Sequence, residues 1–255
     1  MIIIDPKTIK IDKSILDKID QKSKSIYRAI TFCKKISSKA LLDNFIDSTT
    51  CLTELLSIKN AQMEAETEDQ LKLYEKNLNI TIKFVISEIK NEVDFNSEHQ
   101  LFHLFRLVSP ESHKLHPNKY RNTLVQVGGH LCPPPGSVNS LVSQLFYNLK
   151  RIEHPLIKAI YLHHELIRIH PFVDGNGRTT RIAKNWILMY NLYPPIFIKD
   201  SDGKKEYISS LKESFKSLLS NPTSWQKETE NFFTQELNRV LESINNIQLN
   251  LDKLN

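Results

Sequence analysis

The chain has 255 residues, of which 40% are hydrophobic and 25% charged. Such a chain can bury a sizeable core, so this composition excludes an intrinsically disordered or fibrous protein. The formal net charge of +5 is carried by lysines that are interleaved with acidic residues. Because a nucleic-acid-binding surface needs clustered basic residues, we expect no nucleic acid partner. No apolar stretch is long enough to predict a membrane span.

The three cysteines, Cys33, Cys51 and Cys132, have neither the spacing of a metal site nor that of a disulfide framework. An odd number of such thiols favours a reducing compartment. Residues 1–6 have too short an apolar run, and no basic leader, for a secretory signal peptide. We therefore expect a cytoplasmic protein, in the bacterial cytosol or, for a secreted effector, in the cytosol of a host cell.

Residues 7–100 predict helices. Neither Gly nor Pro occurs between Lys7 and Ser109, although strands joined by tight turns usually need them. Apolar residues recur at helical spacing in three separate runs. These runs cover Ile15–Cys33, Leu41–Ile58 and Asp69–Val93.

Farther along, the chain changes character. Residues 109–118 are rich in Ser, Pro and His, and they predict a loop. Leu124–Val127 is the one persuasive β stretch, and it is ended by Gly128–Gly129 and the prolines at 133–135. We expect a short β-hairpin, or flap, over residues 120–135.

The C-terminal half again predicts helices. Pro155 stands at a position that is tolerated in the first turn of a helix, and residues 201–203 predict a turn. The expected helices cover residues 138–149, 204–219 and 223–249, together with two motif helices whose apolar runs are residues 156–169 and 182–192. The predicted fold class is all-α, a helical bundle with a small β-hairpin flap.

The segment His170–Arg181 combines a histidine, a carboxylate, a Gly-Asn-Gly turn and two arginines. A helix N-terminus presents unpaired N–H groups and partial positive charge, and a glycine-rich turn before it lets backbone amides approach an anion. Arg178 and Arg181 lie three apart, on one face of the first turn of that helix, where they can neutralise oxyanions. The segment therefore predicts a phosphate site.

Two further side chains add chemistry to that site. Asp174 can ligate Mg²⁺, which prefers one or two carboxylates plus substrate phosphates. His170, whose ordinary pKa is close to neutrality, is the natural base for a hydroxyl nucleophile. Together these residues predict phosphoryl or nucleotidyl transfer.

The same segment matches the signature of the Fic family, His-Pro-Phe-x-(Asp/Glu)-Gly-Asn-Gly-Arg-x-x-Arg, without a departure. Residues 120–134 also resemble the family's flap, and Tyr193–Pro195 resembles the segment after its second motif helix. The resemblance implies the helical Fic fold. It makes residues 50–220 the core domain, residues 1–49 a helical extension and residues 221–255 a C-terminal helix.

The resemblance also implies an activity, that of a Mg²⁺-dependent protein adenylyltransferase. Such an enzyme moves AMP from its co-substrate ATP to a Ser, Thr or Tyr hydroxyl of a target protein, and self-modification is a further option. His170 would be the general base and Asp174 the metal ligand, while Phe172 would support His170 by packing. The residues implied to bind nucleotide and phosphate are Gly175, Asn176, Gly177, Arg178, Arg181 and Tyr207.

Two more implications of the resemblance concern binding. The target segment would dock on the flap as an added strand, through main-chain hydrogen bonds. The flap residues concerned are Leu124, Val125, Gln126 and Val127. Tyr207 would line the adenine pocket, but the asparagine that often follows seven residues later in the family is Ser214 here, which puts the contacts to the base in doubt.

Other activities remain open. The signature specifies the phosphates better than the transferred group, which could be UMP, phosphate or phosphocholine. The Doc branch, which transfers phosphate, has lysine in place of the second glycine of the turn, whereas this chain has Gly177. A regulatory module, or one that removes AMP, is a third interpretation, although the intact His170 argues against an inactive site.

Many Fic proteins carry an inhibitory helix, (Ser/Thr)-x-x-x-Glu-(Gly/Asn), whose glutamate pairs with the second arginine of the signature. In the expected place this chain has Leu55–Asn60, with Lys59 where the glutamate would stand. We therefore expect no glutamate brake on Arg181, activity in the isolated protein, and suppression by Lys59→Glu. A rival alignment uses Thr50 and Glu54, and a merely packed helix is the plain alternative.

Several tempting residues are better explained by packing. His163 and His164 lack the spacing of a zinc-binding helix, so we expect packing or supporting contacts from them. Trp186 and Met189 fall within an apolar run and predict core positions.

Overall fold

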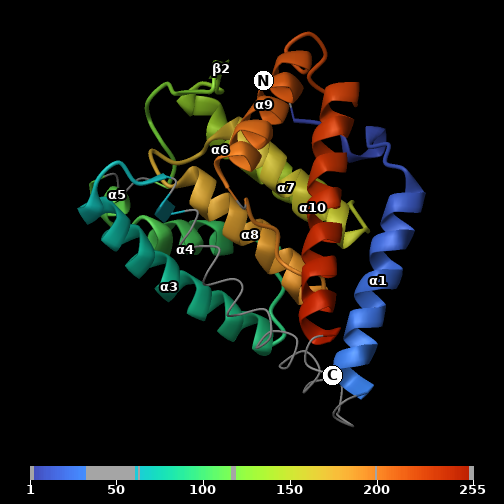
Figure 1. Cartoon of the computed structure of the whole chain (residues 1–255). Coiled ribbons are helices and arrows are strands. Elements are labelled where there is room, and N and C mark those ends of the chain that lie inside the picture. The colour runs from blue at the N-terminus through green and yellow to red at the C-terminus, as the bar shows by residue number, and fades with distance from the viewer. Residues whose placement is uncertain (1–2, 33–60, 63, 116–118, 199, 253–255) are drawn as a thin grey trace.

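Two helices at the centre of the molecule, α7 (Pro155–Ile169) and α8 (Asn176–Tyr190), lie side by side and carry the loop between them (Figure 1). The computed structural model describes residues 3–32, 61–62, 64–115, 119–198 and 200–252. Most of the residues in both helices are buried, in keeping with their nearly continuous apolar sequence.

Local features of the sequence determine where α7 begins and where the loop after it starts and ends. Pro155 occupies the first turn of α7, and the His154 side chain accepts a hydrogen bond from the Leu156 amide. The helix ends at His170, which has a left-handed backbone with φ of 51°. Helix α8 begins after Gly175, whose φ is 73°. Two left-handed residues therefore turn the chain from one helix into the next.

Four helices cover one side of this pair: α3 (Glu68–Lys90), α4 (Glu98–Val108), α5 (Pro110–Leu115) and α6 (Pro135–Leu149). Helix α4 packs on α3 and α8, and α6 packs on α7. Thr67 caps α3, and a capping box formed by Ser97 and Gln100 begins α4. The N-terminus of α3 lies near the same end of α8 as the loop (Figure 1).

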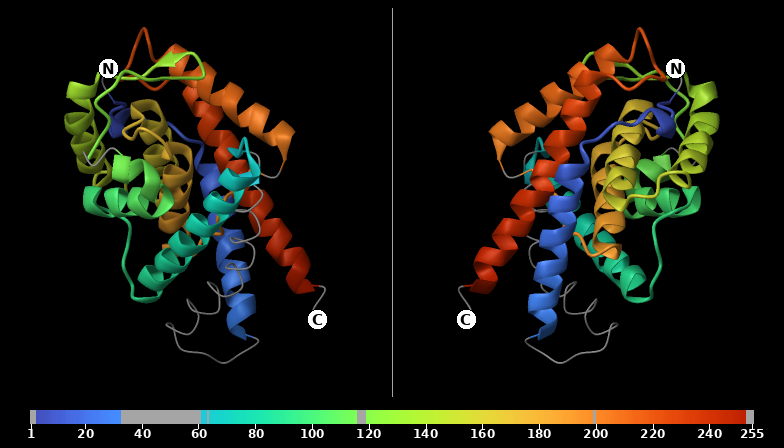
Figure 2. Two further views of the ribbon diagram at one scale, coloured as in Figure 1. Left: turned by 90° about the vertical axis from the view of Figure 1, so that its left-hand side faces the viewer. Right: turned by 90° about the vertical axis from the view of Figure 1, so that its right-hand side faces the viewer.

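The other side is formed by helices from both ends of the chain, α1 (Lys13–Phe32), α9 (Ser201–Ser217) and α10 (Lys227–Asp252). Helix α10 packs on α9, on α1 and on α7, and it runs beside the terminal helix α1 (Figure 2). A short 3₁₀-helix, η1 (Pro6–Thr8), precedes α1.

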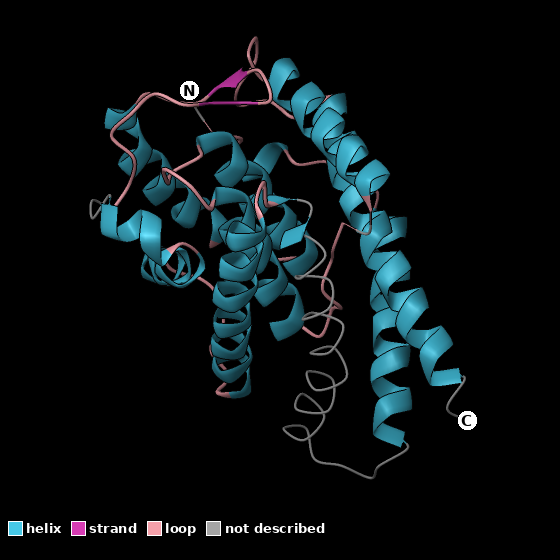
Figure 3. Ribbon diagram, turned by 60° about the vertical axis from the view of Figure 1, so that its left-hand side comes forward, coloured by secondary structure: helices cyan, strands magenta, loops and turns pink. Residues whose placement is uncertain are grey.

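The described strands form one antiparallel hairpin, β1 (Gln126–Val127) with β2 (His130–Leu131). Gly128 and Gly129 both have positive φ, as the tight turn of a two-residue hairpin requires. The hairpin lies at one end of the molecule, and β2 contacts α9 (Figure 3).

The expected fold class, an all-α bundle with a small β-hairpin flap, is confirmed. Trp186 and Met189 are in the core, as expected. Among the described residues no helix is both long enough and apolar enough to cross a membrane.

Several details of the sequence-based prediction differ from the structure. Pro110–Leu115 forms a short helix where a loop was expected. Residues 201–203 lie in the first turn of α9, because the Asp200 side chain accepts a hydrogen bond from the Gly203 amide and caps the helix. The predicted helix Leu41–Ile58, with Cys51, lies outside the described residues, as does Cys33.

Candidate active site

The loop between α7 and α8 is braced by one side chain. The Asn176 carboxamide accepts a hydrogen bond from the Phe172 amide at 2.8 Å and donates one to the Phe172 carbonyl at 2.8 Å. The Asn176 side chain is thus used inside the loop. What it leaves facing outward is the set of first backbone amides of α8, which have no carbonyl partner within the helix.

The two glycines of the turn lie close to neighbouring side chains, and the contact at Gly175 is close enough to exclude a side chain there. A Cβ atom on Gly175 would lie 2.2 Å from the Ser109 hydroxyl oxygen, and its φ of +73° is one that side chains rarely adopt. A Cβ atom on Gly177 would lie 3.1 Å from a guanidinium nitrogen of Arg181. Small residues here let the turn sit against α4–α5 and leave the Arg181 side chain room at the helix end.

His170 is half-buried at the end of α7. Burial lowers the pKa of His170 to about 4, and the Arg121 cation acts in the same direction. The imidazole is therefore neutral near pH 7 and able to accept a proton. Phe172, two residues later, stacks on Phe105 with the ring centroids 4.0 Å apart, which anchors the loop to α4.

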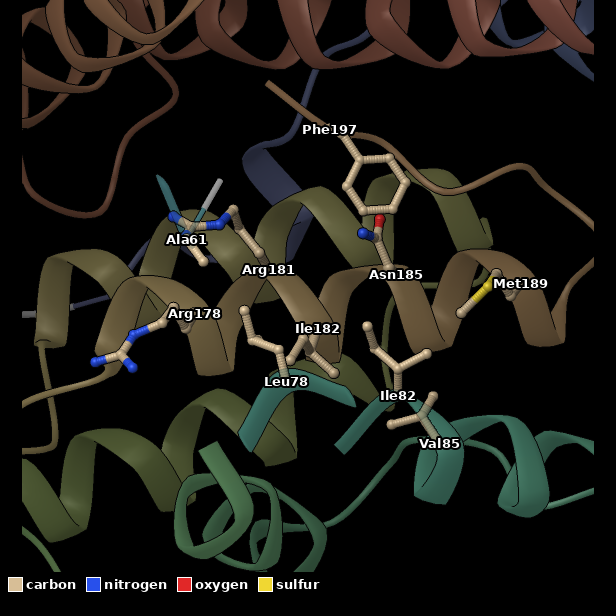
Figure 4. A pocket seen from close by; sticks show the side chains of 10 residues that line it. All are labelled: Ala61, Leu78, Ile82, Val85, Arg178, Arg181, Ile182, Asn185, Met189 and Phe197. Atoms are coloured by element: carbon tan, nitrogen blue, oxygen red, sulfur yellow. The ribbon is translucent and has the colours of Figure 1, made fainter. Parts of the chain in front are cut away.

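The two arginines of the motif both lie on α8, and their stems lie above apolar side chains that α3 contributes (Figure 4). The Arg178 guanidinium lies 3.6 Å from the centre of the Tyr74 ring and contacts the Asp174 carboxylate at 3.0 Å. Its side chain is only 5% exposed. Arg178 is thus held on three sides before any ligand arrives, because Glu64 also lies close to it.

Glu64 is the residue that the sequence analysis missed. Its carboxylate hydrogen-bonds the Arg181 guanidinium and lies 3.7 Å from the Arg178 Nε atom. The expectation that no glutamate would pair with Arg181 is therefore wrong. The inhibitory motif has Gly or Asn after its glutamate, whereas Glu64 precedes an alanine, so the motif does not identify Glu64. Lys59 and Glu54 lie outside the described residues, so the expected effect of Lys59→Glu stays a prediction.

A cavity of about 200 Å³ joins several of these groups, although Arg178 and Asp174 do not line it. Its polar lining includes His170, Gly177, Arg181 and Glu64. Its apolar lining comes from the flap, from the segment before α9 and from α9 itself: Val127, Ile198, Tyr207, Ile208, Leu211 and Phe215. The helix end that is predicted to bind phosphate and an apolar wall thus share one cavity.

The position expected to contact the base, Tyr207, lies in this cavity, whereas Ser214 does not. The Ser214 hydroxyl is buried between His164, at 2.8 Å, and Thr229, at 2.9 Å. The Tyr207 hydroxyl lies 2.7 Å from the His163 Nε2 atom, inside the core. Both histidines are thus fully buried and bonded to neighbouring side chains, and Tyr207 offers the cavity its ring more than its hydroxyl.

Asp174 bears on the question of a metal. Its side chain is 57% exposed and belongs to the loop that carries the α8 amides. Within the described ranges no group of three or more His, Cys, Asp or Glu residues could hold a metal ion. One accessible carboxylate beside a predicted phosphate site suits Mg²⁺ shared with substrate phosphates better than a cage built by the protein alone.

The flap residues have different exposures. Leu124 and Gln126 are exposed, Val125 and Val127 are half-buried, and Val127 lines the cavity. Because β1 pairs with β2 along one edge, its opposite edge faces away from the hairpin. The flap therefore borders the same cavity as His170.

The chain is similar in sequence to known proteins of one family. Residues 91–188 match the model of the Fic/DOC family. The protein adenylyltransferase Fic of Culex quinquefasciatus is 28% identical over 211 residues, which are 77% of this chain and 42% of that protein. That of Drosophila melanogaster is 33% identical over 135 residues, or 51% of this chain and 27% of that protein. The chain spans about half the length, or less, of the curated relatives it matches.

Solved structures show the same architecture. A Fic domain containing signaling protein from Bacteroides thetaiotaomicron has a TM-score of 0.63 at 19% identity, covering 89% of this chain and 96% of that one. Fic-1 from C. elegans has a TM-score of 0.63 at 18% identity, covering 95% of this chain and 76% of that one. At these identities the likeness shows the fold alone.

Proposed function

We infer that this chain, which is a member of the Fic/DOC family with its Fic domain at residues 91–188, transfers AMP from ATP to a hydroxyl of a protein. One observation carries the proposal: His170, whose pKa burial lowers to about 4, lines the same cavity as Gly177 and Arg181 at the N-terminus of α8. The relatives named protein adenylyltransferase support the same chemistry.

In this proposal the nucleotide binds with its phosphates at the N-terminus of α8. The first amides of the helix and the guanidinium groups of Arg178 and Arg181 contact the phosphate oxygens, and the helix dipole favours the negative charge. The base lies toward the apolar wall, against the Tyr207 ring. Asp174 would hold Mg²⁺, which would neutralise charge on the phosphates when bound.

The transfer step needs a base in the neutral form. The target hydroxyl oxygen attacks the α-phosphorus, a new P–O bond forms, and the bond to the bridging oxygen of the β-phosphate breaks. The hydroxyl proton passes to His170, and pyrophosphate leaves. General base catalysis of this kind contributes about 10²–10⁴-fold. The free edge of β1 would hold the target segment beside His170 as an added strand.

Glu64 enters this proposal as a competitor. Its carboxylate occupies the two arginines that the phosphates need, so the nucleotide must displace it. Binding then costs the loss of those ion pairs, and we propose that Glu64 lowers nucleotide affinity.

The same glutamate supports a second candidate function, the removal of AMP from a modified protein. Glu64 brings a carboxylate to the cavity that contains His170. A carboxylate there could hold a water molecule for attack on a phosphodiester. Transfer of UMP, phosphate or phosphocholine is the remaining alternative.

The test uses ATP labelled at either the α or the γ phosphate, with purified protein and a cell lysate as acceptors. We expect α-label on protein, more of it with Glu64→Gln, and loss with His170→Ala or Arg181→Ala. His99→Ala, an exposed histidine on α4, is the matched control and should keep activity. Transfer of γ-label would indicate a kinase instead. The same α-label reaction run with EDTA should give no product, and full activity in EDTA would rule out the Mg²⁺ requirement.

Two results would replace the proposal. The absence of label from either nucleotide, with Glu64→Gln included, would overturn transfer of AMP. Release of bound label during a chase with unlabelled ATP, lost in Glu64→Ala, would favour removal.

A further inference from the structure

We propose that Arg121 is a positioning residue that locks the flap to the end of α7, so that whatever the flap holds is aligned with His170. This inference rests on the proposed function for its consequence, but its geometry and its principal test do not.

A first group of Arg121 hydrogen bonds goes to backbone carbonyls at the end of α7. The Arg121 Nε atom donates to the His170 carbonyl at 2.7 Å, and a terminal nitrogen donates to the Ile169 carbonyl at 3.3 Å. The Arg121 backbone amide donates to the Pro171 carbonyl at 2.9 Å. The last carbonyls of a helix lack partners within the helix and carry partial negative charge, so a cation is favourable there.

A second group of Arg121 hydrogen bonds goes to backbone carbonyls of the flap. One terminal nitrogen of Arg121 donates to the Thr123 carbonyl at 2.6 Å, and the other donates to the Pro133 carbonyl at 2.5 Å. These two residues are the two ends of the hairpin, because the Cys132 amide donates to the Val125 carbonyl just inside them. A single guanidinium therefore closes the base of the flap and ties it to α7.

The shape of arginine is what makes this link. Arg121 is 3% exposed, and every hydrogen bond that its side chain makes to the described residues goes to a backbone carbonyl. A planar guanidinium presents its N–H groups in a fixed fork, whereas a lysine ammonium is a compact charge on a flexible stem. Lysine could keep the charge but could not reach both ends of the flap and α7 together.

The link matters because the flap and His170 belong to different segments. His170 sits at a left-handed position where the chain leaves α7, whereas β1 precedes both α6 and α7 in the chain. A misplacement of about 1 Å between reacting groups can cost roughly a hundredfold in rate. Fixing both segments to one buried group keeps their relative position constant.

The test compares Arg121→Lys with Asn148→Ala. Asn148 is also buried, and its side chain donates to the Ile4 carbonyl and the Tyr161 hydroxyl, away from the cavity. Hydrogen exchange is measured on both variants of the whole 255-residue chain. With Arg121→Lys we expect protection of the Cys132 amide and of the hairpin amides to fall on the order of tenfold, and Asn148→Ala should leave the flap unchanged. Unchanged flap exchange in Arg121→Lys would overturn the proposal.

A second measurement needs no variant, in case Arg121→Lys does not fold. In the wild-type protein the Arg121 and Cys132 amides should open in the same event, with the same dependence on low denaturant. Independent opening of the hairpin at a lower free energy would show that the flap is not locked.

The activity readouts separate this inference from the proposed function. We expect α-label transfer by Arg121→Lys to fall tenfold to a hundredfold, on the order of the misplacement effect, while the Kd for a fluorescent ATP analogue stays the same. Equal transfer by Arg121→Lys and wild type would contradict the positioning role. A protein that transfers no label at all would count against the proposed function, while the exchange results would still decide the role of Arg121.

Discussion

The surroundings of His170 set its pKa well away from the ordinary value of a histidine. Burial lowers its pKa to about 4, from an ordinary value of 6.5, and Arg121 adds to the effect while Asp174 opposes it. A general base acts in its neutral form, so activity is present above this pKa and is lost as the pH falls through it.

We therefore expect kcat/KM for α-label transfer to stay high down to about pH 5 and to fall by half near pH 4. This parameter reports the free protein, in which no phosphate is near the ring. Circular dichroism at each pH checks that the protein is still folded. A half-maximal value near pH 6.5 would contradict the assignment of this environment to the base.

Glu64 is the second residue whose contacts lead to a prediction. Removing its charge with Glu64→Gln should free the arginines and tighten the binding of an ATP analogue on the order of tenfold, a typical coupling between competing contacts. Glu66→Gln makes the same charge change at an exposed position two residues away. Equal tightening in both variants would indicate a general charge effect and not competition for Arg178 and Arg181.

At the scale of elements, the N-terminus of α8 depends on one glycine. Gly175→Ala places a methyl group against Ser109 and forces a side chain into the left-handed region. Strain of this kind costs about 1–3 kcal/mol. We expect a lower free energy of unfolding and weaker nucleotide binding, because the first amides of α8 move.

Gly136→Ala is the control for that change. Gly136 lies in the first turn of α6, its φ is not positive, and a Cβ atom there meets nothing within 4 Å. It should be neutral or stabilise by up to about 1 kcal/mol. Adding Ser109→Gly to Gly175→Ala should recover the part of the loss that comes from the contact. No recovery would assign the whole effect to the backbone.

At the scale of the whole molecule, a buried ion pair joins the signature helix to the last helix. The Lys184 ammonium on α8 lies 2.6 Å from the Glu236 carboxylate on α10, which also pairs with Arg239. Burial would raise the pKa of Glu236, but Lys184 and Arg239 outweigh it and hold that pKa at about 2. The group is therefore charged in the folded protein at any pH of interest.

Breaking this pair leaves a charge without its partner in the core. Glu236→Gln should lower the free energy of unfolding by about 3–5 kcal/mol, since Lys184 is then buried without a carboxylate. The double variant with Lys184→Met should regain much of the loss. Glu213→Gln, an exposed carboxylate on α9, should change stability little. A small effect of Glu236→Gln would mean that the Lys184–Glu236 ion pair adds little to the stability of the folded protein.

Much of the site could be predicted from the sequence because it is local. His170, Asp174, the glycine turn and both arginines occupy one short segment, so the backbone alone brings them to the same helix end. The helices were predictable for a similar reason, since their apolar spacing repeats along the chain. Cap interactions decided the ends, and the capping by Asp200 moved the start of α9 into an expected turn.

The sequence by itself determined the family resemblance, the helical class and the chemistry of residues 170–181, because each depends on residues that are close together in the chain. Only the tertiary structure decided what surrounds that segment. Glu64 reaches Arg181 across 117 positions, and Arg121 reaches the His170 carbonyl across 49. Such contacts follow from how helices pack, and the low pKa of His170 follows from how much water the packing removes. Neither packing nor desolvation can be predicted from a short stretch of the chain, because both depend on residues that are far apart in sequence.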